Sequence, residues 1–168
     1  MMLEIALDAD EEWDSSRFWL PLVRRAAEAA IAESGHPDLA QSDRTVEISV
    51  TLTGDEQVRA LNAKWRGKDK PTNVLSFPMA DERDLARANV SELELLLGDI
   101  VLARRICAAE AADKHIAVED HVAHLIVHGT LHLLGYDHHD ERDAADMEAR
   151  EARALERIGM VNPYEALA

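Results

Sequence analysis

Three histidines in the second half of the chain have the spacing of a metal site. His128 and His132 are four residues apart, so on a helix they project from one face, one above the other. Gly135 follows where a helix can end, because glycine adopts the left-handed conformation at little cost, and the chain can then bring His138 back to the other two. Three imidazoles with one open position are a ligand set of catalytic zinc. The alternative is three surface or hydrogen-bonded core histidines.

The same spacing matches the zinc-protease motif His-Glu-x-x-His-x-x-Gly-x-x-His at every position except one. Gly129 stands where that motif has its glutamate, the general base of the protease. Without that glutamate the three metal ligands are still present, but the group that takes a proton from the attacking water is absent. The sequence therefore disfavours a protease and predicts that the metal serves other chemistry.

The charge of the chain is unevenly distributed. The net charge is -15, which argues against a protein that holds nucleic acid by bulk electrostatics. Residues 58–70, however, contain five basic side chains and only one acidic side chain. The basic residues are Arg59, Lys64, Arg66, Lys68 and Lys70, and the acidic residue is Asp69. This basic segment could place one phosphate group, although ordinary solvated lysines at a helix end are an equal alternative.

Composition indicates one domain that spans residues 1–168. Hydrophobic residues make up 47% of the chain, which is enough for a single core. Cys107 is the only cysteine, so no intramolecular disulfide can form, and the first ten residues lack the pattern of a signal peptide. No segment approaches the ~20 apolar residues of a membrane span. We therefore expect a cytoplasmic protein.

Apolar periodicity predicts the elements that carry these residues. Alternation from Val46 to Leu52 is typical of a half-buried strand, and shorter strands are expected at 3–7, 74–77 and 95–102. Helices are expected after Ser15 or Ser16, after a capping box at 53–56, and at 103–114, 118–134 and 140–158, whereas 79–91 reads as a loop. The pattern predicts an α+β fold in which a small mixed sheet of about four strands packs with about five helices.

The helix at 118–134 would carry two further histidines on the metal-binding face. His121 and His124 precede His128 at spacings that place all of them on one side of the helix. They could be alternative ligands, hydrogen-bond donors behind the ligands, or surface residues. We favour the second or third role, because neither has a glycine turn and a third partner.

Three segments of the chain resemble a known family. They are the histidine segment from His128 to His138, the stretch 61–78 with Arg66 and the run Asp69 to Pro78, and Leu97-Gly98-Asp99-Ile100. Together they look like the YbeY endoribonucleases, the bacterial rRNA maturation factors, over roughly residues 45 to 155. Further similar positions are His121, His124, Met147 and Glu151.

The resemblance implies a metal-dependent, single-strand-directed endoribonuclease. It implies work on the 3′ end of small-subunit rRNA and in ribosome quality control, with zinc on His128, His132 and His138 and with Arg66 as the functional basic residue. Its implied partners are rRNA and ribosomal particles, with ribosomal or GTPase assembly proteins as further candidates. Neither a membrane nor DNA is expected as a partner.

These residues suggest a mechanism as a hypothesis. The metal could activate water or act as a Lewis acid on a phosphate oxygen, with His128 among the catalytic residues. Arg66 would hold the scissile phosphate by paired hydrogen bonds, unless it forms a salt bridge at its helix end. Lys64, Lys68 and Lys70 would add weaker phosphate contacts. Asp99 could orient a ligand histidine or bind a partner protein, or be a solvated strand-end acid. Either water or the RNA 2′-hydroxyl could attack.

Two other function classes stay open at this stage. One is a ribosome-assembly factor that binds particles and uses the metal for structure, although structural zinc is usually closed by four protein ligands. The other is a different metal hydrolase, including a peptidase with an unusual base. Imidazole ligands also suit metals other than zinc.

Overall fold

The fold is built on one four-stranded mixed sheet. The computed structural model describes residues 1–14, 16–86 and 94–164. Within these residues the sheet has the order β1-β2-β4-β3, with β1, β2 and β4 parallel and β3 antiparallel to β4. The predicted α+β class and mixed sheet are confirmed. The strands are β1 (Met2–Ala9), β2 (Thr45–Thr53), β3 (Val74–Pro78) and β4 (Leu95–Ala103).

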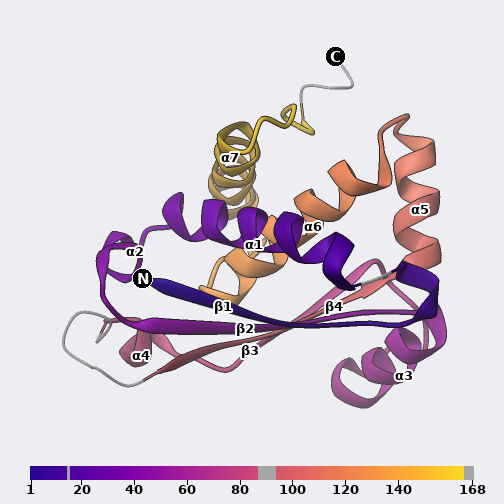
Figure 1. Cartoon of the computed structure of the whole chain (residues 1–168), viewed down its shortest axis with the longest axis horizontal. Helices are drawn as coiled ribbons and strands as arrows, with labels where there is room; N and C mark the ends of the chain where they lie inside the picture. The colour runs from indigo at the N-terminus through magenta and orange to yellow at the C-terminus, as the bar shows by residue number, and fades with distance from the viewer. Residues whose placement is uncertain (15, 87–93, 165–168) are drawn as a thin grey trace.

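Helices lie on both faces of the sheet, and most lie on one. Figure 1 shows α1 and α6 across one face, α7 farther out beyond them, and α3 and α4 on the opposite side. The described residues form seven α-helices and one short 3-10 helix, more than the five helices expected. The helices are the 3-10 helix η1 (Glu11–Trp13), α1 (Ser16–Ala32), α2 (Pro37–Gln41), α3 (Asp55–Arg66), α4 (Glu82–Ala86), α5 (Arg104–Asp113), α6 (Val118–Leu133) and α7 (Glu141–Arg157).

The main core lies between the sheet and the layer of α1 and α6. Alternate residues of β2 (Val46, Ile48, Val50 and Leu52) are all buried there, as period-two alternation predicts. A smaller apolar cluster lies under α3 and contains Val58. The two clusters fix the histidine helix α6 on one face and the basic segment of α3 on the other, with β3 and β4 between them.

A β-bulge in β4 keeps the apolar side chains of that strand on one face. Leu97 and then Ile100 are both in the main core, although they are an odd number of positions apart, because the pairing with β2 shifts between Glu47 and Ile48. Gly98 occupies the bulge with a φ of +144°, and a Cβ there would lie 2.2 Å from the backbone oxygen of Phe77. Only glycine fits this position without moving β3.

Several local expectations are wrong. The start of α3 has no capping box, since Thr53 belongs to β2, Gly54 is the N-cap and no side chain caps the helix. Part of the expected loop at 79–91 is the helix α4, and residues 87–91 lie outside the described part of the chain. Asp81 begins this helix: its carboxylate accepts a hydrogen bond from the Asp84 N–H at 2.9 Å, and the Asp84 carboxylate accepts one from the Asp81 N–H.

Other boundaries agree with the sequence. The helices at 103–114, 118–134 and 140–158 appear within one or two residues of their expected limits, with Asp140 as the N-cap of α7. Ser16 is the first residue of α1, and Ser15 lies outside the described residues. Among the described helices, none has the length and apolar character that a membrane crossing requires.

Candidate metal centre

The end of α6 positions the three histidines. The helix stops after Leu133, and Gly135 follows with a φ of +99°. The N–H of Gly135 donates to the oxygen of His132 at 3.0 Å and the N–H of Tyr136 donates to the oxygen of Leu131 at 3.1 Å. This pair of bonds is the Schellman motif, which reverses the chain after a helix. The predicted role of Gly135 is confirmed, and the turn returns His138 to the helix.

The three imidazoles converge on one point. The Nε2 atoms of His128 and His132 lie 3.0 Å apart, and a nitrogen of His138 completes a set whose atoms all lie within 4.8 Å of one another. Two imidazole nitrogens on one tetrahedral zinc are expected about 3.3 Å apart, given Zn–N bonds of about 2.05 Å. The spacing therefore fits a shared ion, and the cluster could hold a metal.

The electrostatics of the cluster favour neutral imidazole and ionised carboxylate. Burial, together with the nearby His128, lowers the pKa of His132, so its ring is neutral at pH 7 and its lone pair is available to a cation. The pKa of Asp137 is lowered because its carboxylate accepts the His138 N–H at 2.7 Å. An anion thus lies beside the histidines, where it complements a metal ion.

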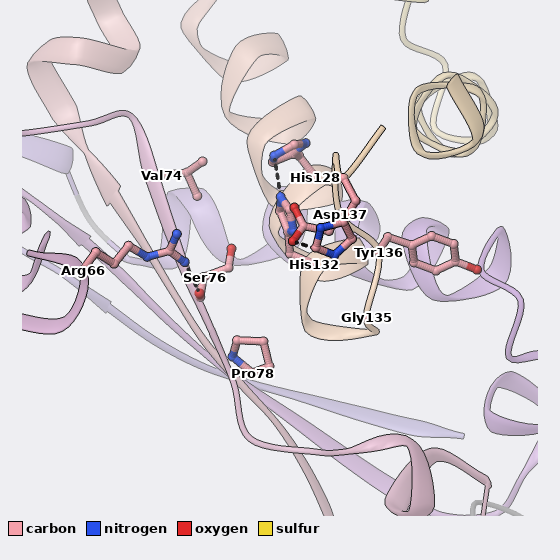
Figure 2. A pocket seen from close by; sticks show the side chains of 10 residues that line it. Arg66, Val74, Ser76, Pro78, His128, His132, Gly135, Tyr136 and Asp137 are labelled. Atoms are coloured by element: carbon pink, nitrogen blue, oxygen red, sulfur yellow. Dashed lines mark hydrogen bonds and ion pairs between the residues drawn. The ribbon is translucent and has the colours of Figure 1, made fainter. Parts of the chain in front are cut away.

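His128 and His132 line a pocket that Arg66 also lines. The pocket has a volume of about 400 Å³ and is bounded by α3, β3 and the α6 turn. Figure 2 shows the Arg66 side chain reaching toward Ser76 from the side opposite His128 and His132. The pocket is lined by Arg66, Val74, Ser76, Pro78, His128, His132, Gly135, Tyr136, Asp137 and His139. The structure therefore brings together two motifs that are about sixty residues apart in the sequence.

Arg66 is held in place by β3. It is the last residue of α3, before Gly67 in the left-handed conformation, and its Nη2 donates to the backbone oxygen of Ser76 at 2.9 Å. The guanidinium carbon lies 5.9 Å from the centre of the Phe77 ring. Since Nη2 can donate twice and Nη1 and Nε carry further N–H groups, the guanidinium can still bind an anion in the pocket. The described contacts of Arg66 are thus with a backbone oxygen and a ring, and the alternative of a helix-end salt bridge has no support in them.

Gly129 lies where α6 packs closely against β3 and β4. A Cβ at this position would lie 3.0 Å from the Ser76 hydroxyl oxygen and 3.2 Å from two atoms of Ile100. A glutamate side chain at residue 129 would have to displace both neighbours. The glycine therefore has a packing role, which agrees with the absence of the protease base.

His121 is buried, so it is not a surface residue, whereas His124 is half-buried with its side chain 12% exposed. The Nε2 of His121 pairs with Oε1 of Glu110 at 2.9 Å, away from the pocket. The Nε2 of His124 lies 3.3 Å from Oε2 of Glu151, whose other oxygen accepts from Nδ1 of His128. His124 thus lies behind a pocket histidine, whereas His121 belongs to a separate ion pair between α5 and α6.

The remaining predicted residues do not line the pocket. Lys64, Lys68 and Lys70 are exposed on α3 and the segment after it. Asp99 lies on β4, between Ser49 of β2 and Phe77 of β3. The carboxylate beside His128 is that of Glu151, and the role of Asp99 toward another ligand histidine or a partner protein stays a prediction. Phosphate contacts of the lysines stay a prediction.

Sequence reasoning gave no role to six residues that line the pocket, and it named the carboxylate behind the pocket, Glu151, only as a position similar to the family. The six lining residues are Val74, Ser76, Pro78, Tyr136, Asp137 and His139. Glu151 carried a readable signal, because it lies four residues after Met147 and four before Leu155, on the apolar stripe of its helix. A charged residue on such a stripe is rarely buried unless it is paired.

Comparisons with known proteins agree in sequence and in fold. A family model described as Endoribonuclease YbeY matches residues 15–159. Proteins named Endoribonuclease YbeY from Rhizorhabdus wittichii and Sphingopyxis alaskensis are 46% and 47% identical over 165 residues, covering 97% of this chain and 97% and 98% of their own. The solution structure of TM1509 from Thermotoga maritima is similar with a TM-score of 0.55 and 21% identity, covering 98% of this chain and 96% of that one, which supports the fold.

Proposed function

Because this chain belongs to the endoribonuclease YbeY family, we propose that it is a metal-dependent, single-strand-directed endoribonuclease that acts in rRNA maturation. One observation carries the proposal: His128 and His132 of the histidine cluster face Arg66 across a single pocket. Cleavage of a phosphodiester needs a group that holds the phosphate and a group that activates the attack or stabilises the developing charge. The two sides of the pocket supply these groups.

The proposed metal ligands are His128, His132 and His138, with zinc as the ion. When bound, the ion would supply Lewis acidity toward a phosphate oxygen or a water molecule. Arg66 would bind the non-bridging oxygens of the scissile phosphate with the N–H groups not used by Ser76. The 2′-hydroxyl or water would then attack in line, and analysis of the ends would distinguish them, since the former leaves a 2′,3′-cyclic phosphate and the latter a simple monoester.

The surface around Arg66 suits single-stranded RNA. Trp65 is 63% exposed, and the Lys64 ammonium lies 5.1 Å from its ring centre. Exposed aromatic rings beside basic groups bind unpaired bases by stacking, and the lysines add salt-dependent attraction to phosphates. The acidic remainder of the protein would repel RNA elsewhere, which directs binding to this side of the molecule.

The rRNA substrate and the cellular setting are part of the same proposal. The substrate would be the 3′ end of small-subunit precursor rRNA, in ribosomal particles in the cytoplasm, and assembly proteins are candidate partners. The packing of Gly129 against Ser76 and Ile100 counts against the peptidase alternative, because the position of the protease base is filled by neighbours.

The experiment combines metal content and RNA cleavage on the same samples. Wild type, His132→Ala and Arg66→Glu would be purified, analysed for metal and assayed on single-stranded RNA and on a precursor with an extended 3′ end. We expect about one metal per chain in wild type, loss of metal and cleavage in His132→Ala, and loss of cleavage alone in Arg66→Glu. His115→Asn is the control, because His115 is exposed after α5 and its positive φ suits asparagine.

Two outcomes would contradict the proposal. Wild type that holds metal but cleaves no RNA would favour the assembly-factor alternative. Wild type that holds no metal would remove the basis of the proposed chemistry.

A further inference from the structure

A carboxylate is buried on the apolar side of α7. Met147, Glu151 and Leu155 lie one turn apart on the face that packs against the rest of the protein, and the Glu151 residue has no exposed surface. Burial of a charged group costs several kcal/mol unless hydrogen bonds replace its water. An apolar residue would serve packing better at this position, so the glutamate needs another explanation.

Both oxygens of Glu151 are used, and they bind different partners. Oε1 accepts a hydrogen bond from Nδ1 of His128. Oε2 lies 3.3 Å from Nε2 of His124 and accepts a hydrogen bond from the hydroxyl of Tyr164, in the segment after α7. The Tyr164 hydroxyl is also 3.3 Å from the same nitrogen of His124. The carboxylate is therefore fixed from one side and presents its other oxygen to a histidine of the pocket.

This contact decides which nitrogen of His128 faces the pocket. If Nδ1 carries the proton that Glu151 accepts, Nε2 has the free lone pair, and this is the atom 3.0 Å from Nε2 of His132. The contact also prevents rotation of the ring, because His128 lies between a buried oxygen and the open pocket. Histidines that bind metals generally need such a partner to set their tautomer and orientation.

We infer that Glu151 is the positioning residue of the histidine cluster: it fixes His128 with Nε2 toward the ion, while His124 and Tyr164 hold its second oxygen. The inference rests on the metal site of the proposed function. It gives a role to His124, which does not line the pocket, and it links the segment after α7 to the strength of metal binding.

The same helix offers a matched control. His121 and Glu110 form the same kind of pair one turn earlier on α6, at 2.9 Å, and Glu110 also accepts from the Asn73 amide at 3.0 Å. This pair contacts no histidine of the pocket. Glu110→Gln therefore removes a carboxylate from a histidine without touching the inferred function.

The test measures zinc affinity by competition with a chelator of known affinity, on full-length apo protein. We expect Glu151→Gln to bind zinc 10- to 100-fold more weakly than wild type, the usual effect of losing such a partner. Glu110→Gln should stay within about twofold of wild type on the same reasoning. Unfolding of the zinc-free proteins in urea separates this effect from a loss of stability.

A Glu151→Gln protein that binds zinc as tightly as wild type would overturn the inference while leaving the proposed function intact. Wild type that binds no zinc would overturn both. An equal loss of affinity in Glu110→Gln would also overturn it, because the effect would then be a general one of packing.

A measurement on wild type covers the case in which Glu151→Gln does not fold. NMR of the ring nitrogens in the zinc-loaded protein should show a proton on Nδ1 of His128 that is shifted downfield and exchanges slowly with water. The ring protons of His115, which is exposed, give the reference for fast exchange. Exchange at His128 as fast as at His115 would overturn the inference, because it would mean that Nδ1 faces solvent rather than a buried carboxylate.

Discussion

Replacement of Arg66 by lysine tests whether the shape of the guanidinium matters, beyond its charge. Arg66 donates to the Ser76 backbone oxygen through Nη2 at 2.9 Å, and its side chain lines the pocket. A lysine has all three N–H bonds on one nitrogen, so it cannot reach the Ser76 oxygen and also offer two parallel donors to a phosphate.

The expected loss is that of one charge-assisted hydrogen bond in the transition state. Such a bond contributes about 1.5–3 kcal/mol, which corresponds to a roughly 10- to 150-fold fall in kcat/KM. The assay is cleavage of single-stranded RNA under conditions in which the rate is proportional to substrate. Zinc content should be unchanged, because Arg66 lies across the pocket from the histidines.

Arg59→Lys is the matched control on the same helix. Arg59 binds the exposed carboxylate of Asp69, with Nε 2.8 Å from Oδ1, and does not line the pocket. This variant should keep kcat/KM within about twofold of wild type, since an exposed ion pair contributes little to stability and this one lies outside the pocket. If Arg66→Lys kept more than a third of the wild-type kcat/KM, the paired hydrogen bonds to phosphate would be refuted.

Four further outcomes test the metal site and the fold. Zinc at 100 times its Kd should stabilise the protein by about 2.7 kcal/mol and raise the melting temperature by roughly 5–11 °C, and a scanning calorimetry trace of His132→Ala that shifts equally would contradict the site. Glu33 accepts hydrogen bonds from Arg153 and Arg157, and Arg157 above all lowers its pKa below the ordinary value of 4.5. Wild type should therefore exceed Glu33→Gln in unfolding free energy by about 1 kcal/mol at pH 7. This difference should disappear as pH falls below about 4.5 through the lowered pKa of Glu33, because the protonated carboxyl no longer pairs with the arginines. A difference in unfolding free energy that stays constant with pH in urea titrations would be inconsistent with the ion pairs. Gly98→Ala should lose about 3 kcal/mol or more, given its positive φ and the 2.2 Å approach to Phe77, and a loss under about 1 kcal/mol would show that the bulge can adapt. Burial raises the pKa of the Cys107 thiol to about 12, so a thiol reagent at pH 8 should label it only after unfolding, and rapid labelling of native protein would show that α5 opens.

The histidine helix and its turn are the part of the site that the sequence could predict. Their geometry follows from contacts between residues at most six positions apart: the helical pitch that aligns His128 with His132, and the glycine turn after Leu134. Alternation in β2 and apolar periodicity in α7 are equally local. These local patterns do not depend on the tertiary contacts of the chain, so the elements that they predict are found in the folded protein.

Local signals also explain some of the wrong expectations. Thr53 and Glu56 have the spacing of a capping box, but pairing with Ala103 of β4 extends β2 through Thr53, and Gly54 becomes the N-cap of α3. In β4 an extra residue at the bulge shifts the alternation by one. Pairing between strands determines both the end of β2 and the bulge in β4, and the sequence of one strand alone does not specify its pairing.

By itself, the sequence determined the longer helices, the four strands and the face of α6 on which the histidines lie. The tertiary structure decided the strand order, the position of Arg66 across the pocket, and the pairing of Glu151 with His128. The reason is physical. Periodicity and capping are properties of neighbours along the chain, whereas an ion pair between α6 and α7, or a pocket between α3 and α6, exists only after burial of apolar faces has fixed where each helix lies on the sheet.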